Sequence, residues 1–115
     1  MARIRTIKPS LWGDEKFSRV SVPARLLYIG LVSMADDDGR FLGSSAAIRG
    51  YVFPNDDISD KRLRAWLDEL DSIGLVVLYE CGGFRYGVHL NYRKHQRISH
   101  PQPSPLPPPE GVLFG

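Results

Sequence analysis

The middle of the chain places a helix pattern directly before two short strand patterns. Residues 59–73 start with Ser59 and Asp60, a helix cap and a first-turn acid, and Gly74 follows the last helical residue. One helix face carries the apolar residues Leu63, Trp66, Leu67, Leu70 and Ile73. The strand patterns, residues 75–79 and 84–93, are joined through Gly82-Gly83, which suits a two-residue hairpin turn. Few small folds contain a helix that leads straight into a hairpin.

Two shorter helices are predicted before this unit. Residues 22–35 form a broad apolar stripe with Ser21 as N-cap, and the Asp36-Asp37-Asp38-Gly39 sequence stops it. Residues 40–42 predict a short strand, and residues 46–52 predict a helix that Ser44 or Ser45 caps and Pro54 ends. Three helices plus a small antiparallel β-hairpin predict an α+β fold, the winged helix-turn-helix, preceded by a basic N-terminal arm.

The length of 115 residues suits one small domain, which we expect to span residues 1–98. Residues 99–115 hold six of the nine prolines, and this composition predicts an extended tail or linker. The single cysteine, Cys81, excludes an internal disulfide and favours the reducing cytoplasm. No apolar run reaches the roughly 18 residues of a membrane span, so no membrane partner is expected.

Charge is distributed unevenly, although the net charge is only +2. Residues 1–19 hold five basic and two acidic residues, a net of +3, and residues 85–100 hold four basic residues and no acid. The acids gather between these zones, from Asp36 to Asp71. Two basic zones on one small domain are typical of proteins that neutralise phosphates.

Within this fold the exposed cations predict contacts with double-stranded DNA. The start of the last helix would reach base edges, and the final strand, with Arg85, His89 and Arg93 on one face, would hold phosphates. The arm, which includes Lys8, would enter the minor groove. The predicted DNA-binding residues are Lys61, Arg62, Arg64, Arg85, Arg93, Lys94, Arg97, Arg3 and Arg5.

Each of these three surfaces has a plainer interpretation. The helix could present a solvated face with i,i+4 ion pairs such as Arg64 with Asp68. A charged final strand can serve only to prevent aggregation, and a basic terminus can simply be solvated.

The sequence contains no pattern typical of catalysis or of a metal site. Cys81 and the three histidines lack metal-ligand spacing, and the run Asp36-Asp37-Asp38 has no second carboxylate cluster or base beside it. We therefore expect no enzyme activity, no metal and no cofactor. Trp12 and Trp66 lie at core spacing, and the arm has further apolar residues that we expect to anchor it, Ile4, Ile7, Leu11 and Phe17.

Four segments resemble a known family: MARIRTIKPSLW, PARLLYIGLVSMADDDGRF, AAIRGYVFPNDD and YRKHQRISHPQPSPLPPPEG. Together they are similar to the N-terminal winged-helix domain of phage replication-initiation proteins, the replisome organisers often compared with DnaD-type primosomal proteins, particularly those of actinobacterial phages and prophages. The resemblance covers residues 1–109. It implies binding to origin DNA and a Pro-rich linker to a C-terminal domain that engages the replication machinery. This chain ends at Gly115, so the sequence leaves open whether such a domain follows.

The sequence therefore predicts the double-stranded DNA-binding domain of a phage replication-initiation protein that performs no catalysis. It would act in the cytoplasm of a bacterial host, at the nucleoid, with host or phage replication proteins as further partners. Two alternatives stay open, a protein–protein adaptor module of phage origin and a small winged-helix transcriptional regulator. A homodimer is compatible with all three.

Overall fold

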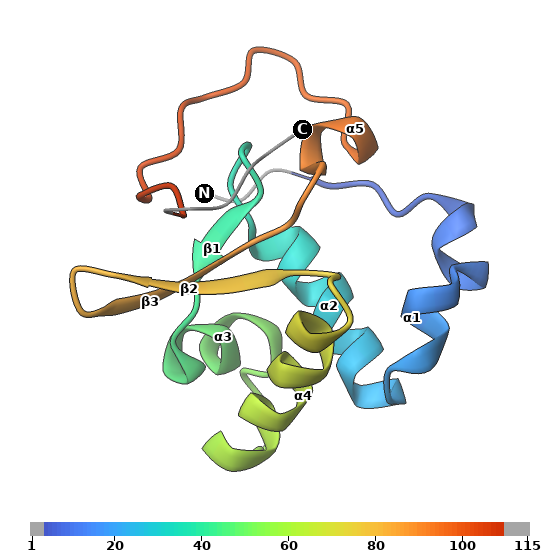
Figure 1. The fold of residues 1–115 in the computed structure, drawn as a ribbon, viewed down its shortest axis with the longest axis vertical. Coiled ribbons are helices and arrows are strands. Elements are labelled where there is room, and N and C mark those ends of the chain that lie inside the picture. The colour runs from blue at the N-terminus through green and yellow to red at the C-terminus, as the bar shows by residue number, and fades with distance from the viewer. Residues whose placement is uncertain (1–3, 110–115) are drawn as a thin grey trace.

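A computed structural model describes residues 4–109 and shows an α+β fold (Figure 1). Its sheet has the strand order β1-β3-β2, and both strand pairs are antiparallel. The element order is η1 Pro9–Gly13, α1 Glu15–Arg19, α2 Val22–Met34, β1 Arg40–Leu42, α3 Ser45–Val52, α4 Asp60–Ser72, β2 Val77–Cys81, β3 Phe84–Val88 and α5 Tyr92–His95. The expectation of three helices was too low, because the described residues contain five α-helices. The two additional helices, α1 and α5, each have only four or five residues.

Serine caps start the three longer helices, as the sequence predicted. The hydroxyl of Ser21 accepts a hydrogen bond from the Ala24 amide at 3.4 Å, and Ser59 accepts from the Arg62 amide at 3.2 Å. Ser44 caps α3, whereas Ser45 is the first helical residue and is buried. Each cap satisfies an amide that the helix itself leaves without a partner.

The hairpin is shorter than its sequence pattern. Gly82 and Gly83 have φ values of +59° and +82°, which fit a two-residue turn that L-residues with a side chain rarely adopt. Strand β3 ends at Val88, so the expected strand to residue 93 was wrong. Asn91 takes a left-handed conformation with φ of 58°, and the chain then turns into α5. His89 and Tyr92 are both buried, which an extended strand with one polar face would not allow.

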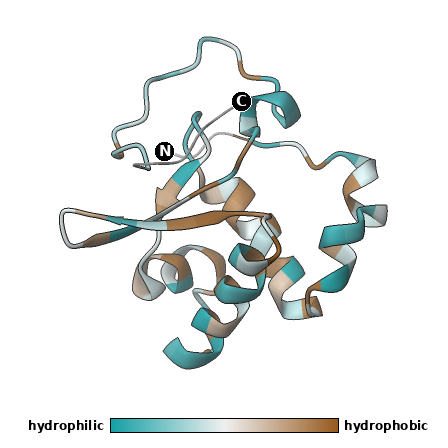
Figure 2. Ribbon diagram, in the orientation of Figure 1, coloured by the Kyte–Doolittle hydropathy of each residue, from teal (hydrophilic) through white to brown (hydrophobic). Residues whose placement is uncertain are grey.

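The core lies between α2, α3, α4 and the inner face of the sheet. Figure 2 shows that hydrophobic residues turn toward the middle of the molecule, while α1 and the outer turns of α4 are largely hydrophilic. The largest fully buried side chains are Phe17, Phe41, Leu27, Leu31, Ile48, Leu63, Leu70, Val76 and Val88.

The apolar residues of the N-terminal arm do not all enter this core. Phe17 is buried, and Ile7 packs against the core from its edge. Ile4 and Trp12, expected as anchors, are 99% and 63% exposed. Trp12 instead lies edge-on against Phe17, with ring centroids 6.0 Å apart. Trp66 is partly buried and contacts Phe53 at 5.9 Å, so it belongs to the core boundary.

Candidate nucleic-acid interface

The start of α4 presents exposed cations. Lys61 and Arg62 are exposed in the first turn, directly after the Ser59 cap. The Arg62 guanidinium lies 5.3 Å from the centroid of the Trp66 ring, a cation–π contact that holds it along the helix. Amide groups at a helix start also attract anions, so this end of α4 favours phosphate.

Arg64 is held by two neighbours. Its Nε lies 2.9 Å from Asp60 Oδ2 and donates a hydrogen bond to Ser45 Oγ at 3.2 Å. The expected pair with Asp68 was therefore wrong, because the side chain turns back toward the start of α4, as helical side chains generally do. The pKa of Asp60 lies below its ordinary value, mainly because of a hydrogen bond from the Ser45 side chain and further because of the Arg64 charge.

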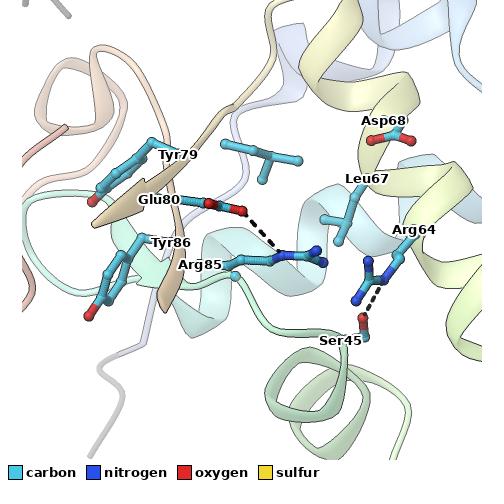
Figure 3. Close-up of a pocket in the computed structure, with 10 residues that line it drawn as sticks. Ser45, Arg64, Leu67, Asp68, Tyr79, Glu80, Arg85 and Tyr86 are labelled. Atoms are coloured by element: carbon cyan, nitrogen blue, oxygen red, sulfur yellow. Dashed lines mark hydrogen bonds and ion pairs between the residues drawn. The ribbon is translucent and has the colours of Figure 1, made fainter. Parts of the chain in front are cut away.

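A groove of about 320 Å³ separates α4 from the β2–β3 hairpin (Figure 3). Arg85 extends from the hairpin toward α4, and Arg64 reaches toward Ser45 from the other side. The Arg85 Nε lies 3.7 Å from Glu80 Oε1 on the facing strand. The groove is lined by Gly43, Ser45, Arg64, Leu67, Asp68, Leu78, Tyr79, Glu80, Arg85 and Tyr86. Two arginines face two acids here, so a phosphate entering the groove must compete with carboxylates.

The N-terminal arm lies beside α5, and this contact joins parts of the two basic zones. The Thr6 amide donates to Gln96 Oε1 at 2.9 Å, and Gln96 Nε2 donates to the Thr6 carbonyl at 2.8 Å. Lys8 Nζ donates to the Lys94 carbonyl at 3.2 Å. Three exposed cations result on this surface, Lys8, Lys94 and Arg97, which we call the arm patch.

Arg5 does not form the free minor-groove arm that the sequence suggested. Its side chain is only 6% exposed, and its Nη2 donates to Asp37 Oδ1 at 2.9 Å and to the Ala35 carbonyl at 3.0 Å. The guanidinium also lies 5.3 Å from the Tyr92 ring centroid. Arg5 is therefore a structural residue. Arg3 lies outside the described residues.

Arg93 and His89 also depart from their predicted places on an outer strand face. Arg93 belongs to α5, where its Nη2 lies 2.7 Å from Asp38 Oδ1 and its Nε donates to the Asp37 carbonyl at 3.2 Å. His89 is 4% exposed and lies among the rings of Tyr28, Phe41 and Tyr92. Burial lowers the pKa of His89 to about 4, against a smaller opposing effect of the Leu31 carbonyl. This histidine is neutral and contributes no charge to a DNA surface at neutral pH.

The candidate residues divide into two separate surfaces. The start of α4 and helix α5 lie at opposite ends of the molecule (Figure 1). Arg85 belongs with Lys61, Arg62 and Arg64, whereas Lys94 and Arg97 belong to the arm patch. The second basic zone, continuous along the sequence, is therefore split in space.

Sequence reasoning missed the groups that restrain these arginines. Asp60 and Arg64 stand at i,i+4 spacing, so their pairing was visible in the sequence. Ser45 gave no such signal, because it lies 19 residues from Arg64 and its role depends on how α3 packs against α4. Within residues 4–109, no three His, Cys, Asp or Glu side chains are grouped so as to hold a metal ion. In the same range every helix is too short or too polar to cross a membrane.

Comparison of the chain with protein-family models, curated proteins and solved structures gave no significant match.

Proposed function

We propose that this chain binds double-stranded DNA as a winged helix, with α4 as the recognition helix and the β2–β3 hairpin as the wing. The element order supports this proposal, because β1 lies between α2 and α3, and the hairpin follows α4. Helices α2, α3 and α4 pack against one another, as the helical part of such a fold requires. The short α1 and α5 then decorate the domain on the side of the arm.

The observation that carries the proposal is the placement of four cations around one groove. Lys61 and Arg62 are exposed on the first turn of α4, while Arg64 and Arg85 face each other between α4 and the hairpin. A recognition helix contacts base edges with its N-terminal residues, and a wing adds phosphate contacts beside it. The arrangement gives both elements a cation on the same surface.

The rest of α4 limits how the helix meets DNA. Residues 60–72 contain three basic and four acidic residues, a net of −1, and Asp68 and Asp71 are exposed in its later turns. Like charges repel across a desolvated contact. The first turn would therefore enter the groove of DNA, while the C-terminal turns stay away from the phosphates.

Replication is the role that we assign to this DNA binding. The support is the resemblance of the opening segment and of the KHQRISHPQPS segment to phage replication-initiation proteins. On this proposal the natural target is origin DNA, and host or phage replication proteins are the further partners.

A matched pair of double variants tests the DNA surface. Lys61→Ala with Arg62→Ala and Lys94→Ala with Arg97→Ala each remove two exposed positive charges. We expect the first pair to weaken duplex binding and to reduce the salt dependence by about 0.9 per lost phosphate contact, while the second pair has little effect. Fluorescence titrations at two salt concentrations measure both quantities.

Two results would contradict this assignment. Loss of binding only in the second pair would move the interface to the arm patch. Binding by the parent chain that does not change with salt would exclude phosphate recognition altogether.

An adaptor function is the second candidate, because a hollow with apolar walls opens between the start of α2 and the start of α4. Val22 and Leu26 are 70% and 56% exposed there, beside Trp66 and Ile58, around a volume of about 430 Å³. Exposed apolar residues that cluster often mark a protein contact. Capture of a replication protein that Val22→Ser with Leu26→Ser abolishes, with no detectable DNA binding by the parent, would favour the adaptor.

A further inference from the structure

The proline-rich tail does not leave the domain as a free segment over the described range. It departs from α5 and arches back toward β1 (Figure 1). Residues 99–109 contain no helix or strand, and prolines occupy positions 101, 103, 105, 107, 108 and 109. Such a segment prefers an extended polyproline conformation and has few amide donors.

Each amide between these prolines has a side-chain acceptor. The Gln102 amide donates to Asp37 Oδ2 at 2.9 Å, and the Ser104 amide donates to Asp38 Oδ2 at 2.9 Å. The Leu106 amide donates to Ser104 Oγ at 3.1 Å. The spacing of the acids in the loop after α2 thus matches the spacing of donors in a proline-alternating segment.

The carboxylates in this loop connect the tail to the body of the domain. Asp37 uses Oδ1 for Arg5 and Oδ2 for the tail, and Asp38 uses Oδ1 for Arg93 and Oδ2 for the tail. Asp36 accepts the Arg40 amide at Oδ1 and the Ser104 hydroxyl at Oδ2. The two arginines fix the orientation of Asp37 and Asp38, so the acceptors for the tail are preorganised.

The outer face of the sheet supplies donors for the carbonyl groups of the same segment. Residues alternate between the faces of a strand, so Arg40 and Tyr79 lie opposite the buried Phe41 side of the sheet. Arg40 Nη1 donates to the Leu106 carbonyl at 2.8 Å, and the Tyr79 hydroxyl donates to the Pro107 carbonyl at 2.7 Å. The Tyr79 ring stacks on Tyr86 with centroids 5.6 Å apart. Aromatic rings with hydroxyl or guanidinium donors are a recurrent surface for proline-rich peptides.

We propose that the Asp36–Asp38 loop and the outer sheet face form a binding site for proline-alternating peptides, and that residues 101–109 of the same chain occupy it. The site is independent of the DNA surface, because it uses neither the start of α4 nor Arg85. Its recognition chemistry is a carboxylate for every second amide and a side-chain donor for the carbonyl groups that follow. A separate peptide with the same pattern offers the same groups.

Amide hydrogen exchange of the whole chain tests whether the tail is bound. We expect the amides of Gln102, Ser104 and Leu106 to exchange more slowly than in a free peptide of residues 100–109. Tyr79→Phe removes one donor and keeps the ring, so it should speed this exchange about two- to tenfold. Tyr86→Phe is the matched control, and we expect it to leave the exchange unchanged.

A second measurement asks whether the surface is a peptide site rather than a packing contact. Ser104→Pro in the whole chain removes the amide and hydroxyl donors, which should open the site to a fluorescent peptide of residues 100–109. Adding Tyr79→Phe to that variant should weaken the peptide's binding. Free-peptide exchange rates in the parent, or no peptide binding by Ser104→Pro, would overturn the proposal. Protection that rises with protein concentration would also overturn it, because the tail would then occupy a second copy.

Discussion

Arg5 Nη2 and Asp37 Oδ1 lie 2.9 Å apart, and their side chains are only 6% and 5% exposed. The pair ties the N-terminal arm to the loop after α2. Arg5→Ala would leave Asp37 buried without this cation, so we expect a loss of about 3–5 kcal/mol of unfolding free energy. Urea unfolding monitored by circular dichroism measures it.

The control for this prediction is a solvent-exposed ion pair of the same chemistry. Arg19 pairs with Glu15 in α1, and both side chains are more than half exposed. Arg19→Ala should change stability by less than about 1 kcal/mol, because exposed pairs contribute little. Equal losses in the two variants would mean that Arg5 is not buried in solution.

Two glycines differ in the space available for a methyl group, which predicts opposite effects of alanine. A Cβ atom at Gly87 would lie 2.3 and 2.4 Å from atoms of the buried Phe41 ring, so Gly87→Ala should destabilise the fold by about 1–3 kcal/mol. Gly50 lies exposed in α3 with nothing within 4 Å of that position, so Gly50→Ala should stabilise by about 0.5–1 kcal/mol. Thermal unfolding of both variants gives the two signs.

The buried His89 should make stability fall in mildly acidic solution. Its pKa is lowered from 6.5 to about 4, so the unfolded chain binds a proton at a higher pH than the folded one does. Stability is complete above pH 6.5, declines as the pH falls and levels off below pH 4, with a total loss of about 3 kcal/mol. His89→Leu should remove this part of the dependence, while the exposed His95→Gln should retain it. Parallel curves for His89→Leu and the parent would contradict the prediction.

Local signals account for what was predictable in the fold. Ser21 and Ser59 act on amides three residues away, and the apolar spacing of residues 63–73 lies within one helix, so both could be found without tertiary information. The end of β3 and helix α5 could not. The Tyr92 hydroxyl donates to the buried Val32 carbonyl at 2.7 Å across 60 residues, and such long-range contacts override a strand pattern.

The candidate site divides in the same way. The exposure of Lys61 and Arg62 follows from helical periodicity, and the structure confirms it. The burial of Arg5 and the pairing of Arg93 depend on partners 32 and 55 residues away, for which the sequence offered no spacing rule. Cations that look alike in a sequence therefore differ in role, because only tertiary packing decides which ones meet an acid.

Acids beside the groove predict that the parent chain binds DNA more weakly than its arginines would allow. Asp60 holds Arg64 at 2.9 Å, and Glu80 lies 3.7 Å from Arg85. Asp60→Asn and Glu80→Gln remove the competing charges and keep side-chain size. On the proposed function, each should raise duplex affinity about two- to fivefold at low salt, and the gain should shrink at high salt because exposed charges are screened.

Glu15→Gln provides the control, because it makes the same charge change on α1, away from the groove (Figure 1). Fluorescence anisotropy with one duplex at two salt concentrations compares the three variants with the parent. If Glu15→Gln raises affinity as much as Asp60→Asn does, net charge alone explains the gain, and the groove is not where DNA binds. If Asp60→Asn and Glu80→Gln have no effect while Lys94→Ala with Arg97→Ala abolishes binding, the arm patch is the DNA surface. A gain confined to the two groove variants would place the phosphates beside Arg64 and Arg85.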